Sequence, residues 1–437
     1  MNSIKIEHFG PVHSAMVDVD KNFQVFIGAQ ASGKSTVCKV VYFCQKIRDY
    51  TLEFLLDSEQ FYKNHKNEYF NNYLKFLTGQ FIGCFGKTTH MRRFCIEYRF
   101  AGKFIRIKLN RDGYVRYEFD ERLKEEITKL IYDTSHMYVF RLNSPDSLLN
   151  NMTTIGMMKQ QVQMALFHIF ENDSEIIYIP AGRSLLATLS EQLYDLSFHT
   201  MDLTMREFIR LVRITKNKFG SKIPDIVKDY TKTVKGQINN SSIEQAYSFI
   251  KKILKAEYTS ESDGEKIYFD DRHWVKLMYG SSGQQEVLWI LMLVFINILE
   301  NKKTFVIIEE PEAHLFPIAQ KDVVELIALM VNTTESKVIL TTHSPYILTS
   351  LNILLYSDKI ENHMSKNGKS IIPKNIRLPY QDFAAYKISG TEANENVFTS
   401  LMDEESHMID TGYIDEVSNI TNRELDDLIS MEIENDL

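Results

Sequence analysis

Apolar residues in this chain gather into short runs rich in β-branched side chains. Residues 23–27 (Phe-Gln-Val-Phe-Ile), 304–308 (Thr-Phe-Val-Ile-Ile) and 337–340 (Lys-Val-Ile-Leu) are three such runs. Continuous apolar runs of this length predict strands that are buried on both faces, as in a parallel sheet. Helical patterns follow at residues 35–49 and 287–299. Strands that alternate with helices predict an α/β fold.

The region between these runs shows a second pattern. Residues 94–100 and 104–109 alternate between apolar and polar side chains, and an Asp-Gly turn follows them. This alternation predicts an antiparallel sheet with one solvated face. Residues 200–256 are predicted to be helices without sustained heptads, so we expect a short lid or an oligomer contact there. Residues 258–278 return to strand.

Composition narrows the class of protein. A hydrophobic fraction of 44% and a charged fraction of 25% are typical of a soluble globular protein. No run of about 18 apolar residues occurs, so we expect no membrane-spanning segment. The first residues enter a strand without a signal-peptide core, and the four cysteines lack C-x-x-C spacing, so we expect a cytoplasmic location. The formal net charge of −8 argues against a nucleic-acid binder as a whole.

The clearest chemistry follows the first buried run. Residues 28–35 read Gly-Ala-Gln-Ala-Ser-Gly-Lys-Ser, which fits the P-loop pattern G-x-x-x-x-G-K-[ST]. The backbone of such a loop surrounds a di- or triphosphate, its lysine neutralises the β- and γ-phosphates, and its hydroxyl holds Mg²⁺. We therefore expect ATP and Mg²⁺, with Ser35 also on the metal. The expected ATP-binding residues in this stretch are Gly28, Ala29, Gln30, Ala31, Ser32, Gly33, Lys34, Ser35 and Thr36.

The other two buried runs also end in side chains that can bind a metal or transfer a proton. The run at 304–308 leads into Glu309 and Glu310, and active-site residues gather at the carboxyl ends of parallel strands. We expect Glu309 to bind Mg²⁺ and Glu310 to polarise the attacking water. His343 ends the third run and is placed to sense the γ-phosphate. Without the P-loop, the alternative would be a buried strand with two solvated acids and a structural histidine.

A Ser-Gly turn opens the helical pattern at 287–299. Residues 279–286 read Tyr-Gly-Ser-Ser-Gly-Gln-Gln-Glu, and such a turn is an anion site or a simple N-cap. The segment resembles the signature of ABC ATPases, usually L-S-G-G-Q, with Ser281 and Gln284 in place of a leucine and a glycine. The motif order resembles the RecF and SMC branch. This resemblance implies an ABC-type P-loop ATPase head, in which Ser282, Gly283 and Gln285 contact ATP held by a partner chain.

Three further motifs resemble overcoming-lysogenization-defect-like ATPases. They are residues 309–317 (Glu-Glu-Pro-Glu-Ala-His-Leu-Phe-Pro), 342–348 (Thr-His-Ser-Pro-Tyr-Ile-Leu) and 176–184. The resemblance covers the ATPase core at both ends of the chain and not the insertions. It implies a homo-oligomer, an ATP-dependent head-to-tail dimer or larger, that hydrolysis releases. It also makes Glu312 and Arg183 candidate sensors, although Arg183 could equally be paired structurally with an acid.

These inferences divide the chain into four parts. We expect an N-terminal ATPase half with the P-loop and the antiparallel β lobe at 1–199, and a helical insertion at 200–257. A C-terminal ATPase half with signature, acidic pair and histidine follows at 258–378. Residues 379–437 form an acidic, mostly helical tail. The tail would dock on a basic neighbour, a sister subunit or an effector, or would be a solvated capping helix.

The same resemblance points to a biological role. Fewer than a hundred residues follow His343, which is too few for the TOPRIM nuclease domain of larger relatives. The chain resembles the standalone ATPases of two-gene anti-phage systems, PARIS with a TOPRIM partner more than Septu with an HNH nuclease. We therefore expect a regulatory ATPase that holds a separate effector and releases it when a phage trigger protein is sensed.

The alternative is a RecF-like DNA-repair ATPase that binds nucleic acid. Basic residues cluster around the predicted antiparallel sheet, where DNA or an acidic partner could bind them. The competing interpretation is a solvated sheet face of mixed charge. The cluster consists of Lys87, Arg92, Arg93, Arg99, Lys103, Arg106, Lys108, Arg111 and Arg116.

Overall fold

A computed structural model describes residues 2–57, 68–91, 93–142, 148–188, 201–233, 239–360, 371–389, 398–412 and 423. A six-stranded sheet forms its centre, in the order β14-β13-β3-β12-β11-β7. Five strands are parallel, and the edge strand β14 is antiparallel to β13. Their bounds are β3 Phe23–Ile27, β7 Glu175–Ile179, β11 Thr304–Glu309, β12 Lys337–Thr342, β13 Phe383–Ile388 and β14 Phe398–Ser400.

Two hydrophobic cores lie on opposite faces of this sheet. Successive residues of one strand enter different cores: Ile307 packs in one, and Ile308 in the other. This is why the strands read as continuous apolar runs. One core holds α10 (Ser282–Leu299), α11 (Pro317–Thr334) and α12 (Pro345–Lys359), and the other holds α1 (Lys34–Leu56). By length and composition α10 could cross a membrane, but 83% of it is buried in the fold.

The antiparallel lobe predicted between residues 94 and 119 is confirmed and extends to the N-terminus. Its order is β2-β1-β4-β5-β6, with bounds Ser3–Phe9 for β1, Val12–Asp18 for β2, Cys95–Phe100 for β4, Lys103–Leu109 for β5 and Val115–Phe119 for β6. Its inner face shares a core with α1 and α3 (Tyr69–Phe85). The helices α4 (Glu121–Leu142) and α5 (Leu148–Phe170) lie side by side next to it and were not predicted.

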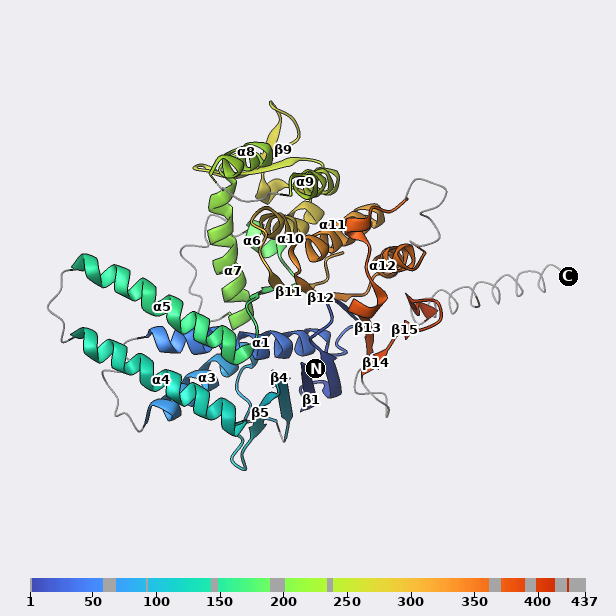
Figure 1. Cartoon of the computed structure of the whole chain (residues 1–437). Coiled ribbons are helices and arrows are strands. Elements are labelled where there is room, and N and C mark those ends of the chain that lie inside the picture. Colours follow the sequence, from blue (N-terminus) through green and yellow to red (C-terminus); the bar gives the residue numbers. More distant parts are fainter. Residues whose placement is uncertain are drawn as a thin grey trace.

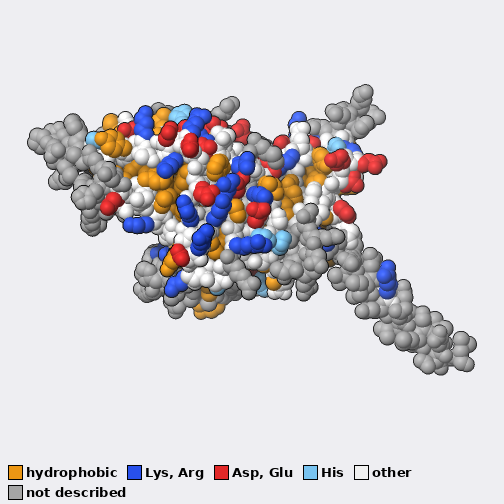
Figure 2. All heavy atoms as spheres, turned by 90° about the horizontal axis from the view of Figure 1, so that it is seen from below, with side chains coloured by type: hydrophobic (Ala, Val, Ile, Leu, Met, Phe, Trp, Pro, Cys, Tyr) orange, Lys and Arg blue, Asp and Glu red, His pale blue; other side chains and the backbone are white. Residues whose placement is uncertain are grey.

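The outer face of this sheet carries paired charges. Arg99 and Arg106 both bind Glu97, and Lys108 binds Glu118 at 3.0 Å. Lys108 also holds the pKa of Glu118 below its usual value. In Figure 2, which views the molecule from this side, basic and acidic side chains are interspersed. This pairing supports the interpretation of a mixed-charge sheet face; Arg92 lies outside the described residues.

The helical insertion forms the opposite end of the molecule (Figure 1). It contains α7 (Leu203–Lys216), α8 (Ile223–Thr233) and α9 (Asn240–Leu254). The strands predicted after it are β8 (Glu257–Glu261), β9 (Gly264–Tyr268) and β10 (Trp274–Lys276), which form a small antiparallel sheet. The α/β fold with an antiparallel β lobe and a helical insertion is therefore confirmed.

The prediction of a mostly helical tail is wrong for the part that the structure describes. Strand β13 pairs in parallel with β3 and so belongs to the central sheet. Phe383 and Ala385 are buried there, because an apolar run next to β3 completes the sheet. The short strands β15 (Met402–Asp403) and β16 (Met408–Ile409) follow; β15 contacts β13, and β16 contacts α12. Residues 413–422 and 424–437 lie outside the described residues.

Candidate functional site

The predicted phosphate loop connects β3 to α1 at the carboxyl end of the central sheet. Gly28 is buried, and a Cβ atom there would clash with the carbonyl oxygen of Ile388 on β13. Gly33, at a φ of 103°, adopts a conformation that side chains disfavour and caps α1. Lys34 is therefore the first residue of the helix. The glycines are required by the backbone path, as the sequence pattern predicts.

Lys34 is held inside this loop. Its Nζ donates hydrogen bonds to the carbonyl oxygens of Gly28 and Ala29, both at 2.9 Å. Burial lowers the pKa of Lys34, and the carboxylate of Glu310 is the largest opposing influence. The Ser32 hydroxyl is buried without a hydrogen-bond partner. A lysine and an unsatisfied hydroxyl inside a loop of backbone N–H groups fit a phosphate group.

The other predicted loop residues lie on its outer side. Ala29, Gln30 and Ala31 are exposed, and so is Ser35 in the first turn of α1, while Thr36 is half-buried. Ser35 is therefore accessible to a metal that arrives with the nucleotide. Within the described residues, no cluster of three or more His, Cys, Asp or Glu side chains is placed to hold a metal by itself.

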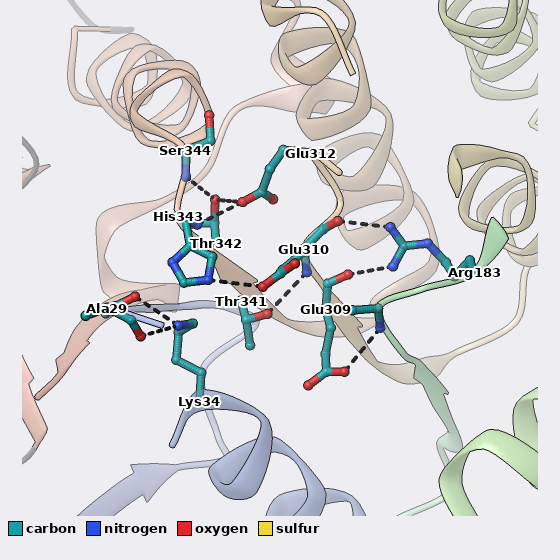
Figure 3. Close-up of polar contacts among 12 residues, drawn as sticks. Ala29, Lys34, Arg183, Glu309, Glu310, Glu312, Thr341, Thr342, His343 and Ser344 are labelled. Atoms are coloured by element: carbon teal, nitrogen blue, oxygen red, sulfur yellow. Dashed lines mark hydrogen bonds and ion pairs between the residues drawn. The ribbon is translucent and has the colours of Figure 1, made fainter. Parts of the chain in front are cut away.

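The acidic pair stands at the end of β11, beside the phosphate loop (Figure 3). Glu309 is buried, and its Oε2 accepts a hydrogen bond from the backbone N–H of Ala181 at 3.2 Å. Burial, and next the Glu309 carboxylate, raise the pKa of the Tyr178 hydroxyl well above its usual value. Glu309 is therefore a fixed carboxylate on the floor of the site.

Glu310 adopts an unusual backbone conformation. Its φ of 43° lies in the left-handed region, which costs a non-glycine residue about 1–2 kcal/mol. Its backbone N–H donates to the carbonyl and to the hydroxyl of Thr341, at 3.0 and 3.2 Å. The turn directs the Glu310 carboxylate to His343, whose Nε2 lies 3.0 Å from Oε1. These hydrogen bonds hold the half-exposed carboxylate in place and offset the backbone strain.

Glu312 organises the loop that carries His343. Its Oε1 accepts hydrogen bonds from the Thr342 hydroxyl at 2.6 Å and from the backbone N–H of His343 at 2.8 Å. Burial raises the pKa of Glu312. Sequence reasoning missed Thr341 and Thr342. Their signal is a pair of threonines at the end of an apolar strand, directly before the histidine.

Arg183 lies behind the acidic pair and is fully buried. Its guanidinium donates to the carbonyl oxygens of Pro180, Glu309 and Glu310 and lies 3.5 Å from the Glu286 carboxylate. The structure therefore shows the structural pairing with an acid that the sequence left open. Glu286 was not predicted.

The signature turn forms the N-terminus of α10. Ser281 and Gln284 make a reciprocal capping box, which gives a physical reason for the two departures from the usual signature. The Gln285 amide donates to the carbonyl oxygens of Met278 and Gly280, at 3.0 Å each. Ser282 is exposed.

The signature turn and the phosphate loop have separate hydrogen-bond partners. The side-chain amides of Gln284 and Gln285 donate to the carbonyl oxygens of residues 254, 278 and 280. A Cβ atom at Gly283 would lie 2.8 Å from the carbonyl oxygen of His314, so the turn packs against the loop that follows the acidic pair. Over the described residues, no hydrogen bond runs from this turn to the phosphate loop.

Comparisons with known proteins identify one family for this chain. The family model described as "AAA ATPase domain" matches residues 1–348. Among solved structures, an SMC head bound to the C-terminal winged-helix domain of ScpA is 12% identical with a TM-score of 0.40; the match covers 92% of this chain and 97% of that one. The SMC head domain from Thermotoga maritima is 9% identical with a TM-score of 0.36, covering 92% and 98%. No curated protein matches in sequence.

Proposed function

The chain belongs to the AAA ATPase domain family, and from that premise we propose that it hydrolyses ATP at a site completed by the signature of a second copy. The observation that carries the proposal is the convergence of Lys34, Glu310 and His343 at one end of the central sheet (Figure 3). These residues offer a phosphate-binding cation, a general base and a hydrogen-bonding partner for that base.

Each residue has a step in hydrolysis. Lys34 exchanges its two loop carbonyls for the β- and γ-phosphates. Glu310 accepts the proton of the water that attacks the γ-phosphorus. His343, already hydrogen-bonded to Glu310, lies where it can also contact the γ-phosphate. Ser35 and Glu309 would hold Mg²⁺, which supplies positive charge against the phosphate oxygens.

Four exposed apolar side chains near the signature turn support a second copy as the partner. Tyr279, Phe316, Ile318 and Tyr346 are 72%, 76%, 66% and 52% exposed, and we call them the apolar collar. They are close in the fold: the turn after Tyr279 packs on residues 314–315, and the Ser344 hydroxyl binds Gln320. Large exposed apolar groups beside an incomplete site are typical of an interface.

We expect Phe316→Asp to weaken ATP-dependent dimerisation, because it places a charge on the most exposed side chain of the collar. The measurement is sedimentation of the protein with ATP and Mg²⁺, over a range of protein concentrations. We expect the dimer dissociation constant to rise by roughly tenfold or more, the loss of one buried aromatic anchor. The matched control is Ile371→Asp. Ile371 is 79% exposed, like Phe316, but it lies in the segment after α12. That segment binds Asn332 at the C-terminal end of α11, whereas Phe316 lies at the N-terminal end. Equal effects of the two variants would exclude the collar as the interface.

At a finer level we propose a regulatory ATPase of an anti-phage system, whose assembly holds or releases a separate effector. The motifs at 309–317 and 342–348 support this, by their resemblance to overcoming-lysogenization-defect-like ATPases. All four cysteines are free, in keeping with the cytoplasm. Co-expression with the product of the neighbouring gene tests it. An ATP-dependent complex is expected; a lone dimer whose turnover rises on DNA, with steep salt dependence, would contradict it.

A further inference from the structure

The Arg183 side chain makes four hydrogen bonds to main-chain carbonyl oxygens. Its side chain is fully buried, and a buried guanidinium is costly unless its N–H donors are paired. Its Nε donates to the carbonyl oxygen of Glu286 at 2.8 Å. One terminal nitrogen binds the carbonyl oxygens of Pro180 and Glu309 at 2.7 and 2.6 Å, and the other binds that of Glu310 at 2.9 Å.

These acceptors belong to three separate elements. Pro180 follows β7, Glu309 and Glu310 end β11, and Glu286 lies in the second turn of the signature helix α10. The contact with Glu286 is reciprocal. Its carboxylate accepts from the backbone N–H groups of Arg183 and Ser184, at 3.0 and 3.1 Å. The start of α10 therefore cannot shift without disturbing the main chain of the acidic pair.

Glu310 is the residue on which such a shift would act. Its left-handed backbone is held on its N–H side by Thr341 and on its carbonyl side by Arg183. Moving the carbonyl rotates the peptide that aims the carboxylate at His343. A base misplaced by about 1 Å can lose roughly 10²-fold in rate.

We propose that Arg183 and Glu286 couple the signature helix to Glu310, and through them couple the two ATP sites of a dimer. The inference rests on the proposed function, because in a head-to-tail dimer the signature of one copy serves the site whose base belongs to the other copy. ATP that engages a signature therefore pulls, through Arg183, on the base of the opposite site. Arg183 is a positioning residue, since it touches no substrate.

The first test compares Arg183→Lys with Arg48→Lys. Arg48 is also buried and donates to the main-chain carbonyls of Asn172 and Ser174, which directly precede the N-terminal end of β7. Lysine keeps the charge of either residue but loses the planar fork. We expect both variants to lower the Tm, and Arg183→Lys alone to lower kcat, by roughly 10- to 100-fold. Its affinity for ATP stays within about threefold of wild type. Losses of activity that simply follow the Tm in both variants would overturn the proposal.

Mixed dimers test the coupling itself. When one copy carries Lys34→Ala, a single site holds ATP, and we expect its rate to fall below half that of the wild-type dimer. With Arg183→Lys in the ATP-holding copy, the rate per site should no longer depend on whether the opposite site is filled. An unchanged dependence would overturn the proposal. Glu286→Gln, which weakens the same contact from the other side, replaces Arg183→Lys if that variant does not fold.

The composite ATP site and the coupling through Arg183 can be tested separately. If the wild-type protein hydrolyses ATP as a monomer, at a rate independent of protein concentration, the composite site is wrong. If hydrolysis by the wild-type protein requires the dimer, but the Arg183→Lys variant hydrolyses ATP at the same rate, only the proposed coupling is wrong.

Discussion

Glu310→Gln is expected to bind ATP normally and to stop hydrolysis. The amide keeps the shape of the side chain and can still hydrogen-bond His343, but it cannot accept the proton of the attacking water. Loss of a general base lowers a rate by about 10²- to 10⁴-fold. Under the proposed function, hydrolysis separates the copies, so the ATP-bound assembly should persist. Single-turnover hydrolysis and the mass of the assembly after addition of ATP measure the two effects.

The matched control for this variant is Glu335→Gln. Glu335 also adopts a left-handed backbone, at a φ of 53°, but it is exposed at the C-terminus of α11. The control should hydrolyse ATP at the wild-type rate. Hydrolysis at that rate by Glu310→Gln would show that Glu310 is not the base.

Lys34→Ala is expected to lose nucleotide binding. A charged hydrogen bond to phosphate contributes about 1.5–3 kcal/mol, so the dissociation constant for ATP should rise by roughly 10- to 150-fold. The substitution also removes the partner of the Gly28 and Ala29 carbonyls, so the loop loses its preformed shape. Titration with a fluorescent ATP analogue measures the affinity, and thermal unfolding checks the fold.

Lys39→Ala is the control one turn further along α1. Lys39 lies on the same helix as Lys34, and its ammonium binds the Asp202 carboxylate at 2.9 Å. Affinity for ATP should stay at the wild-type level. Equal losses of affinity in both variants would mean that the effect comes from helix α1 and not from phosphate recognition.

The sequence predicted the strands β3, β11 and β12 of the central sheet and the glycine-rich loop after β3, because both depend on local patterns. Buried parallel strands are apolar throughout, and the P-loop needs glycines at fixed spacing. The residues that sequence reasoning missed act over long distances in the chain. Glu286 meets Arg183 across 103 positions, and no local pattern marks such a contact.

In the tail, the sequence prediction relied on overall composition and missed a local apolar pattern. Its acidic residues suggested an exposed helical segment, but the apolar residues of β13 complete the central sheet next to β3. Composition averaged over 379–437 concealed a six-residue strand. The helices α4 and α5 escaped prediction because their long patterns carry no motif that called attention to them.

The most direct test of the account is to mix two inactive variants. Ser282→Arg disrupts the signature, and Lys34→Ala disrupts the phosphate loop, on separate copies. In a mixed dimer, one site then has an intact phosphate loop from one copy and an intact signature from the other. The account predicts that ATPase activity, absent from each variant alone, returns on mixing to at most about a quarter of the wild-type rate, from half the dimers with one working site each. The proposed coupling lowers the rate further, because the opposite site of each mixed dimer holds no ATP. No recovery, from two variants that are each folded, would contradict a site shared between copies.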